Sequence, residues 1–203
     1  MALERVDAEE LIRVGLRRLL EENYELFVGK ANERAITSLL AGYLADDHRI
    51  PAGLRVDHEY NRLGLGYTKN LRVWIQGELL TDQYDNPIEK PRIPDILVHG
   101  LGDNEDNVIA IEVKVNAFNN DGDKSKIWAL MSDPLAYQFG VLLSLPRKKG
   151  PDGPIWTPLW AWNPEPGNTA VNYEPAFDED TAAELAASGR EEMSKRLKAR
   201  GRG

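Results

Sequence analysis

The nine residues "NVIAIEVKV", positions 107–115, constrain the fold more than any other segment. Alternate positions on one side of this segment are all apolar, namely Ile109, Ile111, Val113 and Val115. Such a pattern is typical of a central strand that is covered on both faces of a sheet. The other side carries Glu112 and Lys114, and charges on a buried strand are costly unless they are paired or functional.

The preceding segment "IPDILVHG", residues 93–100, predicts a second strand that pairs with the first. If the two form an antiparallel hairpin around "GLGDNED", the symmetric register pairs residues whose numbers add up to 207. Asp95 then lies opposite Glu112, with β-carbons about 4.5–5.5 Å apart. Lys114 follows two residues later on the same face, about 6.6 Å along the strand. A slip of the register by two residues keeps the three side chains on one face.

Two carboxylates at that spacing repel each other, so one of them must take up a proton or find a cation. Lys114 can neutralise one acid, and the other is left for a divalent metal, for which oxygen ligands favour Mg²⁺ or Mn²⁺. The alternative is a purely structural ion pair of Lys114 with Glu112 or with Asp95.

The rest of the chain predicts helices around these strands. The first helix is expected to begin at Asp7, with Glu10 completing a capping box, and the second begins with Asn32 as its N-cap. A third is expected from residue 121, capped by Asp121 or Asp123, and a fourth is expected in the tail at 178–203.

Further strands are expected at 54–62, at 136–146 and at 155–163, and an extra one at 70–80, followed by a loop over 81–92. In the strand at 54–62, Leu54, Val56, His58 and Tyr60 are expected to share one side. The order of elements predicts an α/β class in the broad sense, an α+β mixed sheet flanked by helices. We expect one domain, 1–203, with an N-terminal helix at 1–28, a core at 30–163, and a C-terminal helix and basic tail at 178–203. The last fourteen residues hold six Lys or Arg and two Glu and are expected to fray.

Charge and composition exclude several classes of protein. The formal net charge is -8, with 25 basic and 33 acidic residues, so a protein that coats nucleic acid non-specifically is a poor fit. An enzyme that contacts nucleic acid over a small patch remains compatible with this net charge. No apolar run is long enough to span a membrane, and the absence of cysteine fits a cytoplasmic location. The three histidines show no metal-ligand spacing.

"PD" at 94–95, followed sixteen residues later by "EVK" at 112–114, resembles the PD-(D/E)XK nuclease superfamily. In order, "NERAITSLLAGYL", "VDHEYNR", "IPDILVHG", "NVIAIEVKV" and "AYQFGVLLSL" are similar to blocks of its small bacterial and phage-encoded members. The resemblance covers about residues 30 to 145. It implies a restriction-endonuclease-like core of a helix, three antiparallel strands, a helix and a fourth strand. It also implies hydrolysis of nucleic-acid phosphodiesters with Mg²⁺ or Mn²⁺.

The resemblance also implies roles for single residues. Asp95 and Glu112, with the backbone carbonyl of Val113, would hold the metal, and Lys114 would orient or deprotonate the attacking water. Members often add an acid from the first core helix, where Glu33 stands. Glu33 is equally well explained as an acid that complements the helix dipole, and Glu59 is the competing extra acid.

Other candidates rest on charge or ring chemistry alone. Basic residues that could contact nucleic-acid phosphates are Lys124, Lys126, Arg147 and Lys148. Tyr137 and Gln138 stand where related nucleases place a polar residue, although core packing is the simpler interpretation of Tyr137. Packing in the core or at an interface is likewise a simpler interpretation than base stacking for Trp156, Trp160 and Trp162.

The expected function is that of a metal-dependent deoxyribonuclease, possible in restriction or phage defence, with DNA as its partner. A homodimer or a larger defence complex is compatible with the small size and acidic surface. The alternative is a catalytically inactive nuclease-like module that binds nucleic acid or a partner protein.

Overall fold

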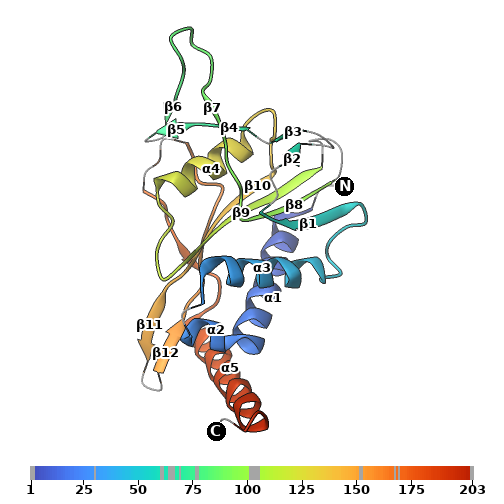
Figure 1. The fold of residues 1–203 in the computed structure, drawn as a ribbon, viewed down its shortest axis with the longest axis vertical. Coiled ribbons are helices and arrows are strands. Elements are labelled where there is room, and N and C mark those ends of the chain that lie inside the picture. Colours follow the sequence, from blue (N-terminus) through green and yellow to red (C-terminus); the bar gives the residue numbers. More distant parts are fainter. Residues whose placement is uncertain are drawn as a thin grey trace.

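The centre of the protein is a six-stranded mixed sheet with the strand order β1-β8-β9-β10-β13-β14 (Figure 1). The computed structural model describes residues 3–29, 31–59, 62–63, 67–68, 70–75, 78–100, 106–150, 153–166, 168 and 170–201. The strands of the sheet are β1 (Leu54–His58), β8 (Ile96–Gly100), β9 (Asn107–Val115), β10 (Phe139–Leu145), β13 (Leu159–Trp162) and β14 (Glu174–Pro175). Neighbouring strands are antiparallel except β9 and β10, which are parallel because helix α4 (Asp121–Met131) carries the chain back between them.

The register of the β8–β9 hairpin confirms the sequence prediction. Ile96 pairs with Ile111 and Leu97 with Ala110, so the residue numbers of each pair add up to 207 as predicted. The pairing shifts by one residue after Val98. Asp95 immediately precedes β8 and therefore lies opposite Glu112. Residues 101–105 of the expected turn, and residues 60–61 of the strand expected at 54–62, lie outside the described residues, and β1 ends at His58.

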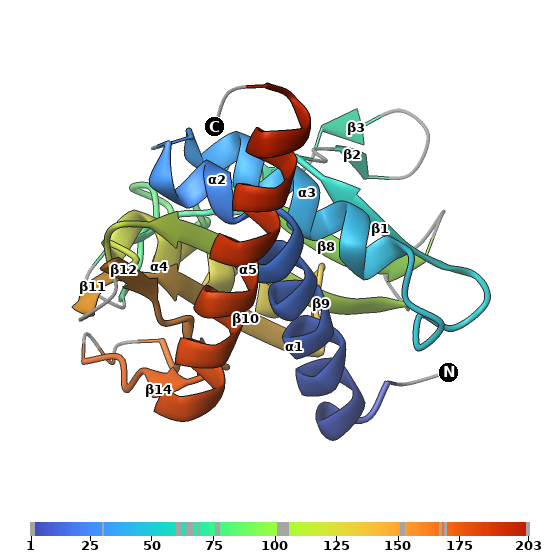
Figure 2. The same cartoon turned by 90° about the horizontal axis from the view of Figure 1, so that it is seen from below.

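Helices cover both faces of the sheet, which confirms the α+β class with a large mixed sheet. On one face lie α1 (Arg5–Glu22), α2 (Tyr24–Val28), α3 (Glu33–Ala45) and α5 (Glu179–Ala199), and Figure 2 shows α1 and α5 side by side. They share an apolar core with Ile109, Ile111 and Val113 of β9. Helix α4 covers the opposite face, where Ile127 and Leu130 pack against the side of β9 that carries Ala110.

Short ribbons surround the sheet. They pair β2 (Arg62–Leu63) with β3 (Tyr67–Thr68), β4 (Asn70–Arg72) with β7 (Glu89–Pro91), β5 (Trp74–Ile75) with β6 (Glu78–Leu79), and β11 (Arg147–Gly150) with β12 (Gly153–Trp156). The extra strand predicted at 70–80 is thus three short strands outside the central sheet, and the predicted loop contains β7. In Figure 1 the ribbons of β4–β7 lie next to α4, and the loop between β6 and β7 projects beyond this helix. They are fixed to it where the backbone N–H of Trp74 donates to the Ser125 hydroxyl at 3.1 Å.

Two of the predicted N-caps are wrong and one is confirmed. Helix α1 begins at Arg5 without a side-chain cap, so Asp7 lies in its first turn and forms no capping box. The Asn32 side chain does cap α3, accepting from the Ala35 N–H at 2.8 Å. Helix α4 is capped by Asn120, with Asp123 as the reciprocal member of a capping box.

The C-terminal part differs from the prediction in two places. The single strand expected at 155–163 is divided at Thr157 and Pro158 into β12 and β13, because proline has no N–H to donate to a ladder. The described part of the tail does not fray as expected, since α5 continues to Ala199 and Arg196 donates to the Glu22 carbonyl at 2.8 Å. Trp156 and Trp160 are buried in the core, as expected. Among the described residues, no helix is long and apolar enough to cross a membrane.

Candidate functional site

Asp95 is held in place through both its main chain and its side chain. Its Oδ2 accepts a hydrogen bond from the Val113 N–H at 2.8 Å, and its carbonyl accepts one from the Glu59 N–H at 3.0 Å. Burial raises the pKa of the Asp95 carboxyl, against the opposing effect of the Val113 hydrogen bond. The hairpin therefore fixes one acid at the end of β8, directed at β9.

Glu112 is the most buried member of the site, with 0% of its surface exposed. The ammonium of Lys126, from α4, forms an ion pair with its Oε2. This contact is an ion pair rather than a well-aligned hydrogen bond, and Oε1 accepts no hydrogen bond from the described part of the chain. Burial, followed by the negative charge of Asp95, raises the pKa of Glu112 well above its usual range. This carboxylate depends on a neighbouring cation to stay ionised.

Lys114 points to a different pair of acids. Its Nζ lies 2.9 Å from Glu33 Oε1 and 3.5 Å from Asp123 Oδ1. Burial lowers the pKa of Lys114, but the hydrogen bond with Glu33 and the charges of Asp123 and Asp95 outweigh it, and the net shift is upward. Lys114 is thus held in its charged form.

Glu33 rather than Glu59 joins the lysine of the motif. Glu33 stands in the first turn of α3, where it complements the helix dipole, and its Oε2 also accepts from the Val115 N–H at 3.1 Å. Glu33 can therefore complement the dipole of α3 and, at the same time, lie in the site as the partner of Lys114. Glu59 instead forms an ion pair with Arg34 at 2.5 Å.

Two residues of α4 complete what we call the acid–lysine cluster, defined as Glu33, Asp95, Glu112, Lys114, Asp123 and Lys126. Lys126 was expected among the phosphate contacts, yet it is turned inward to Glu112. Asp123, considered from sequence only as a helix cap, also faces both lysines of the cluster. Both residues follow soon after the strand that carries Lys114, which was the only sequence feature that pointed to them. Which side chains of α4 point toward the cluster is decided by how this helix packs on the sheet.

The remaining phosphate candidates lie apart from Glu112. Lys124 forms an ion pair with Asp121 at 3.2 Å. Arg147 and Lys148 are exposed on β11, where Lys148 reaches Glu179 at 3.4 Å. The structure thus brings only Lys126 of the four into the cluster.

The two polar candidates before β10 have structural partners instead. Tyr137 is buried in the core beneath α4, as expected. Gln138 Nε2 donates to the Leu3 carbonyl at 3.0 Å, away from the cluster.

A buried polar group that the sequence did not indicate supports β9 from behind. Asn119 Nδ2 donates to the backbone carbonyl of Glu112 at 3.2 Å. Its Oδ1 accepts from the hydroxyls of Ser144 at 2.9 Å and Tyr173 at 3.0 Å. Burial raises the pKa of Tyr173, so this phenol stays protonated and can donate. These contacts hold the main chain at Glu112 in position.

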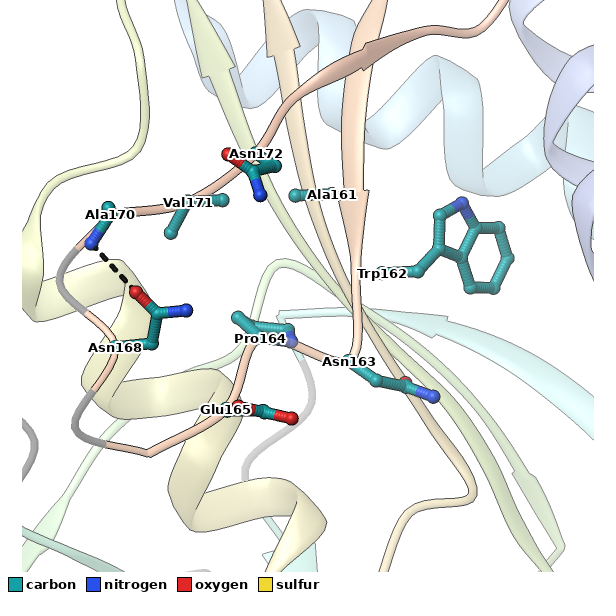
Figure 3. A pocket seen from close by; sticks show the side chains of 9 residues that line it. All are labelled: Ala161, Trp162, Asn163, Pro164, Glu165, Asn168, Ala170, Val171 and Asn172. Carbon is teal, nitrogen blue, oxygen red and sulfur yellow. Dashed lines mark hydrogen bonds between the residues drawn. The ribbon is translucent and has the colours of Figure 1, made fainter.

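A cavity of about 150 Å³ lies at the end of β13, separate from the cluster (Figure 3). Its described lining is mostly amide and small side chains, among them Asn163, Asn168 and Asn172, and includes no member of the acid–lysine cluster. Its one drawn hydrogen bond runs from the Ala170 N–H to Asn168 Oδ1. The described lining of this cavity offers no pair of titratable side chains for catalysis.

The residues that could hold a divalent cation are Asp95 and Glu112, with the Val113 carbonyl as a further oxygen. In the described ranges, no three His, Cys, Asp or Glu side chains are grouped so as to hold a metal by themselves. Glu112 Oε1 is buried and receives no hydrogen bond from the residues that the structure describes, so its surroundings suit a cation best.

Neither family models, nor curated proteins, nor solved structures give a match to this chain.

Proposed function

We propose that this protein is a metal-dependent nuclease that hydrolyses phosphodiester bonds of DNA, with Asp95, Glu112 and Lys114 at its active site. One observation carries the proposal. The hairpin brings Asp95 opposite a fully buried Glu112, one oxygen of which has no donor among the described residues, and a charged Lys114 follows on the same strand.

The arrangement of elements supports a restriction-endonuclease-like core. Helix α3 precedes the antiparallel strands β1, β8 and β9, and helix α4 then leads to β10, which is parallel to β9. This is the order that the resemblance to the PD-(D/E)XK superfamily implies. The short ribbons between β1 and β8 are additions to that order.

The oxygen ligands present fit Mg²⁺ or Mn²⁺. Asp95 keeps one carboxylate oxygen beyond the Val113 hydrogen bond, and Glu112 Oε1 accepts from no donor in the described ranges. Hard divalent cations prefer such carboxylate and carbonyl oxygens. A bound cation would stabilise negative charge on the scissile phosphate and lower the pKa of water.

Lys114 would act as a fixed positive charge. Because Glu33 and Asp123 raise its pKa, it remains an ammonium at neutral pH and orients the attacking water or stabilises charge in the transition state, rather than removing a proton. Glu33 acts through Lys114 and is a positioning residue.

The test is a cleavage assay on supercoiled plasmid, linear duplex, single-stranded DNA and RNA with Mg²⁺ or Mn²⁺. Asp95→Asn and Lys114→Met should each reduce cleavage by at least about a hundredfold. Asp180→Asn and Lys195→Met, on the exposed side of α5, make the same changes of charge and should leave cleavage unchanged.

Undiminished cleavage by both site variants would refute the mechanism. Binding of nucleic acid without cleavage in any metal would favour the inactive module instead. Cytoplasmic location, a homodimer and a role in a larger defence complex remain predictions.

A further inference from the structure

Asp123 uses its two carboxylate oxygens for different purposes. Oδ2 accepts from the Asn120 N–H at 2.9 Å, as part of the capping box of α4. Oδ1 faces Lys114 Nζ at 3.5 Å and Lys126 Nζ at 3.9 Å. Because Asp123 is only 5% exposed and is fixed by the cap, it presents a rigid acceptor to both lysines.

Lys126 therefore has two acids within reach. Its ammonium forms an ion pair with Glu112 Oε2 and lies 3.9 Å from Asp123 Oδ1. A lysine side chain has four rotatable bonds, so a change of rotamer can transfer the ammonium from one acid to the other. Helix α4 does not have to move for this.

A divalent cation and the Lys126 ammonium cannot share Glu112 without strong repulsion. The carboxylate has no access to solvent, and like charges at contact distance in such a poorly screened place interact strongly. A cation at Oε1 would therefore be repelled by the ammonium at Oε2, and its binding favours the removal of Lys126 from Glu112.

We propose that Lys126 is the resident counter-cation of Glu112, that a divalent metal displaces it, and that Asp123 receives the displaced ammonium. This inference rests on the proposed function, because it assumes that Glu112 is a metal ligand. It gives Lys126 and Asp123 a role in setting metal affinity, which is distinct from contact with nucleic-acid phosphates.

The test is Mn²⁺ binding to the full chain, first stripped of metal with EDTA and then titrated in a calorimeter without any nucleic acid. Lys126→Met removes the competitor and should bind Mn²⁺ about tenfold more tightly than the native protein. Asp123→Asn keeps a side-chain oxygen for the helix cap but is a weaker acceptor for the Lys126 ammonium. This variant should bind Mn²⁺ about fivefold more weakly than the native protein.

The double variant separates displacement from simple attraction of charges. If Asp123 acts by receiving Lys126, Asp123→Asn should change affinity by less than about twofold once Lys126 is already methionine. If Asp123 only attracts the metal through space, its effect should be the same in both backgrounds, which would overturn the inference. Lys195→Met, which makes the same change of charge on exposed α5, should leave the affinity unaltered.

The remaining outcomes of the titrations also decide for or against the inference. Should Lys126→Met fail to fold, Lys126→Gln replaces it, and Asp123→Asn alone still tests the scheme, since an unaltered affinity overturns it. If the protein binds Mn²⁺ but the effects of the Lys126 and Asp123 substitutions on affinity are additive, this inference is overturned and the proposed function is left intact. If the native protein and all variants bind no Mn²⁺, the metal-dependent function fails as well.

Discussion

Lys126→Met should destabilise the metal-free protein, and more so at high pH than at low pH. The substitution removes the cation next to Glu112, a carboxylate with 0% exposure. The methionine keeps most of the apolar stem, so the loss is mainly that of the charge. The carboxylate cannot reach water and must either stay ionised alone or take up a proton.

The size of the loss of stability follows from the unequal burial of Glu112 and Lys126. Removing one partner of a buried pair costs about 3–5 kcal/mol when the other charge is left without compensation, and we expect this at pH 8. The reverse change, Glu112→Gln, leaves Lys126 with 15% side-chain exposure and with Asp123 at 3.9 Å. That change should cost only about 1–2 kcal/mol.

The dependence on pH follows from the raised pKa of Glu112 in the folded protein. A raised folded pKa means that stability is fully present below the unfolded value, near 4.5, and is lost as pH rises through the folded value. Since Lys126 lowers this pKa, its removal extends the loss to higher pH. The difference between variant and native protein should therefore be small at pH 5 and largest at pH 8.

Urea unfolding in EDTA at pH 5 and pH 8, followed by circular dichroism, measures these differences. Lys195→Met serves as the control for charge. Equal losses for Lys126→Met and Glu112→Gln at pH 8, or a loss that does not depend on pH, would refute the reasoning from burial.

Three further changes test other contacts. Gly140→Ala should cost about 1–3 kcal/mol in urea unfolding, because its β-carbon would lie 2.5 Å from Ile127 Cγ2 and would also press on Met131; unaltered stability would contradict the close packing of α4 on β10. Asn119→Ala should cost about 1–3 kcal/mol in thermal unfolding, because it removes the hydrogen bonds of the Asn119 amide with the Glu112 carbonyl and with the hydroxyls of Ser144 and Tyr173. Glu112→Gln should flatten the dependence of metal-free stability on pH between 5 and 8, and a slope as steep as that of the native protein would assign the dependence to other groups.

The hairpin and its facing acids could be predicted because strand alternation and a symmetric turn leave little freedom. The same applies to Asn32, which directly precedes an amphipathic run. At the start of α4 the sequence "NNDGD" offers several caps, and Asn120 with Asp123 prevails because each accepts from the other's N–H. For α1 no side-chain cap forms, and Asp7 contributes only as an acid in the first turn.

The partners of the lysines could not be predicted, because they depend on how α4 packs on the sheet. Ile127 and Leu130 are buried beneath the sheet, and their packing directs Lys126 at Glu112. The length of α5 was missed for a similar reason. Arg196 reaches the end of α1 over a separation of 174 residues, which no local pattern reveals.

The ion pair between Lys114 and Glu33 joins residues that are 81 positions apart in the chain. Contacts of such long range require large loops to close, and they form late when a chain folds. During synthesis, α3, the β8–β9 hairpin and α4 must all have left the ribosome before the acid–lysine cluster can assemble. A nascent or truncated chain that ends before residue 126 therefore lacks the counter-ion of Glu112, whose carboxylate then has no compensating charge from Lys126.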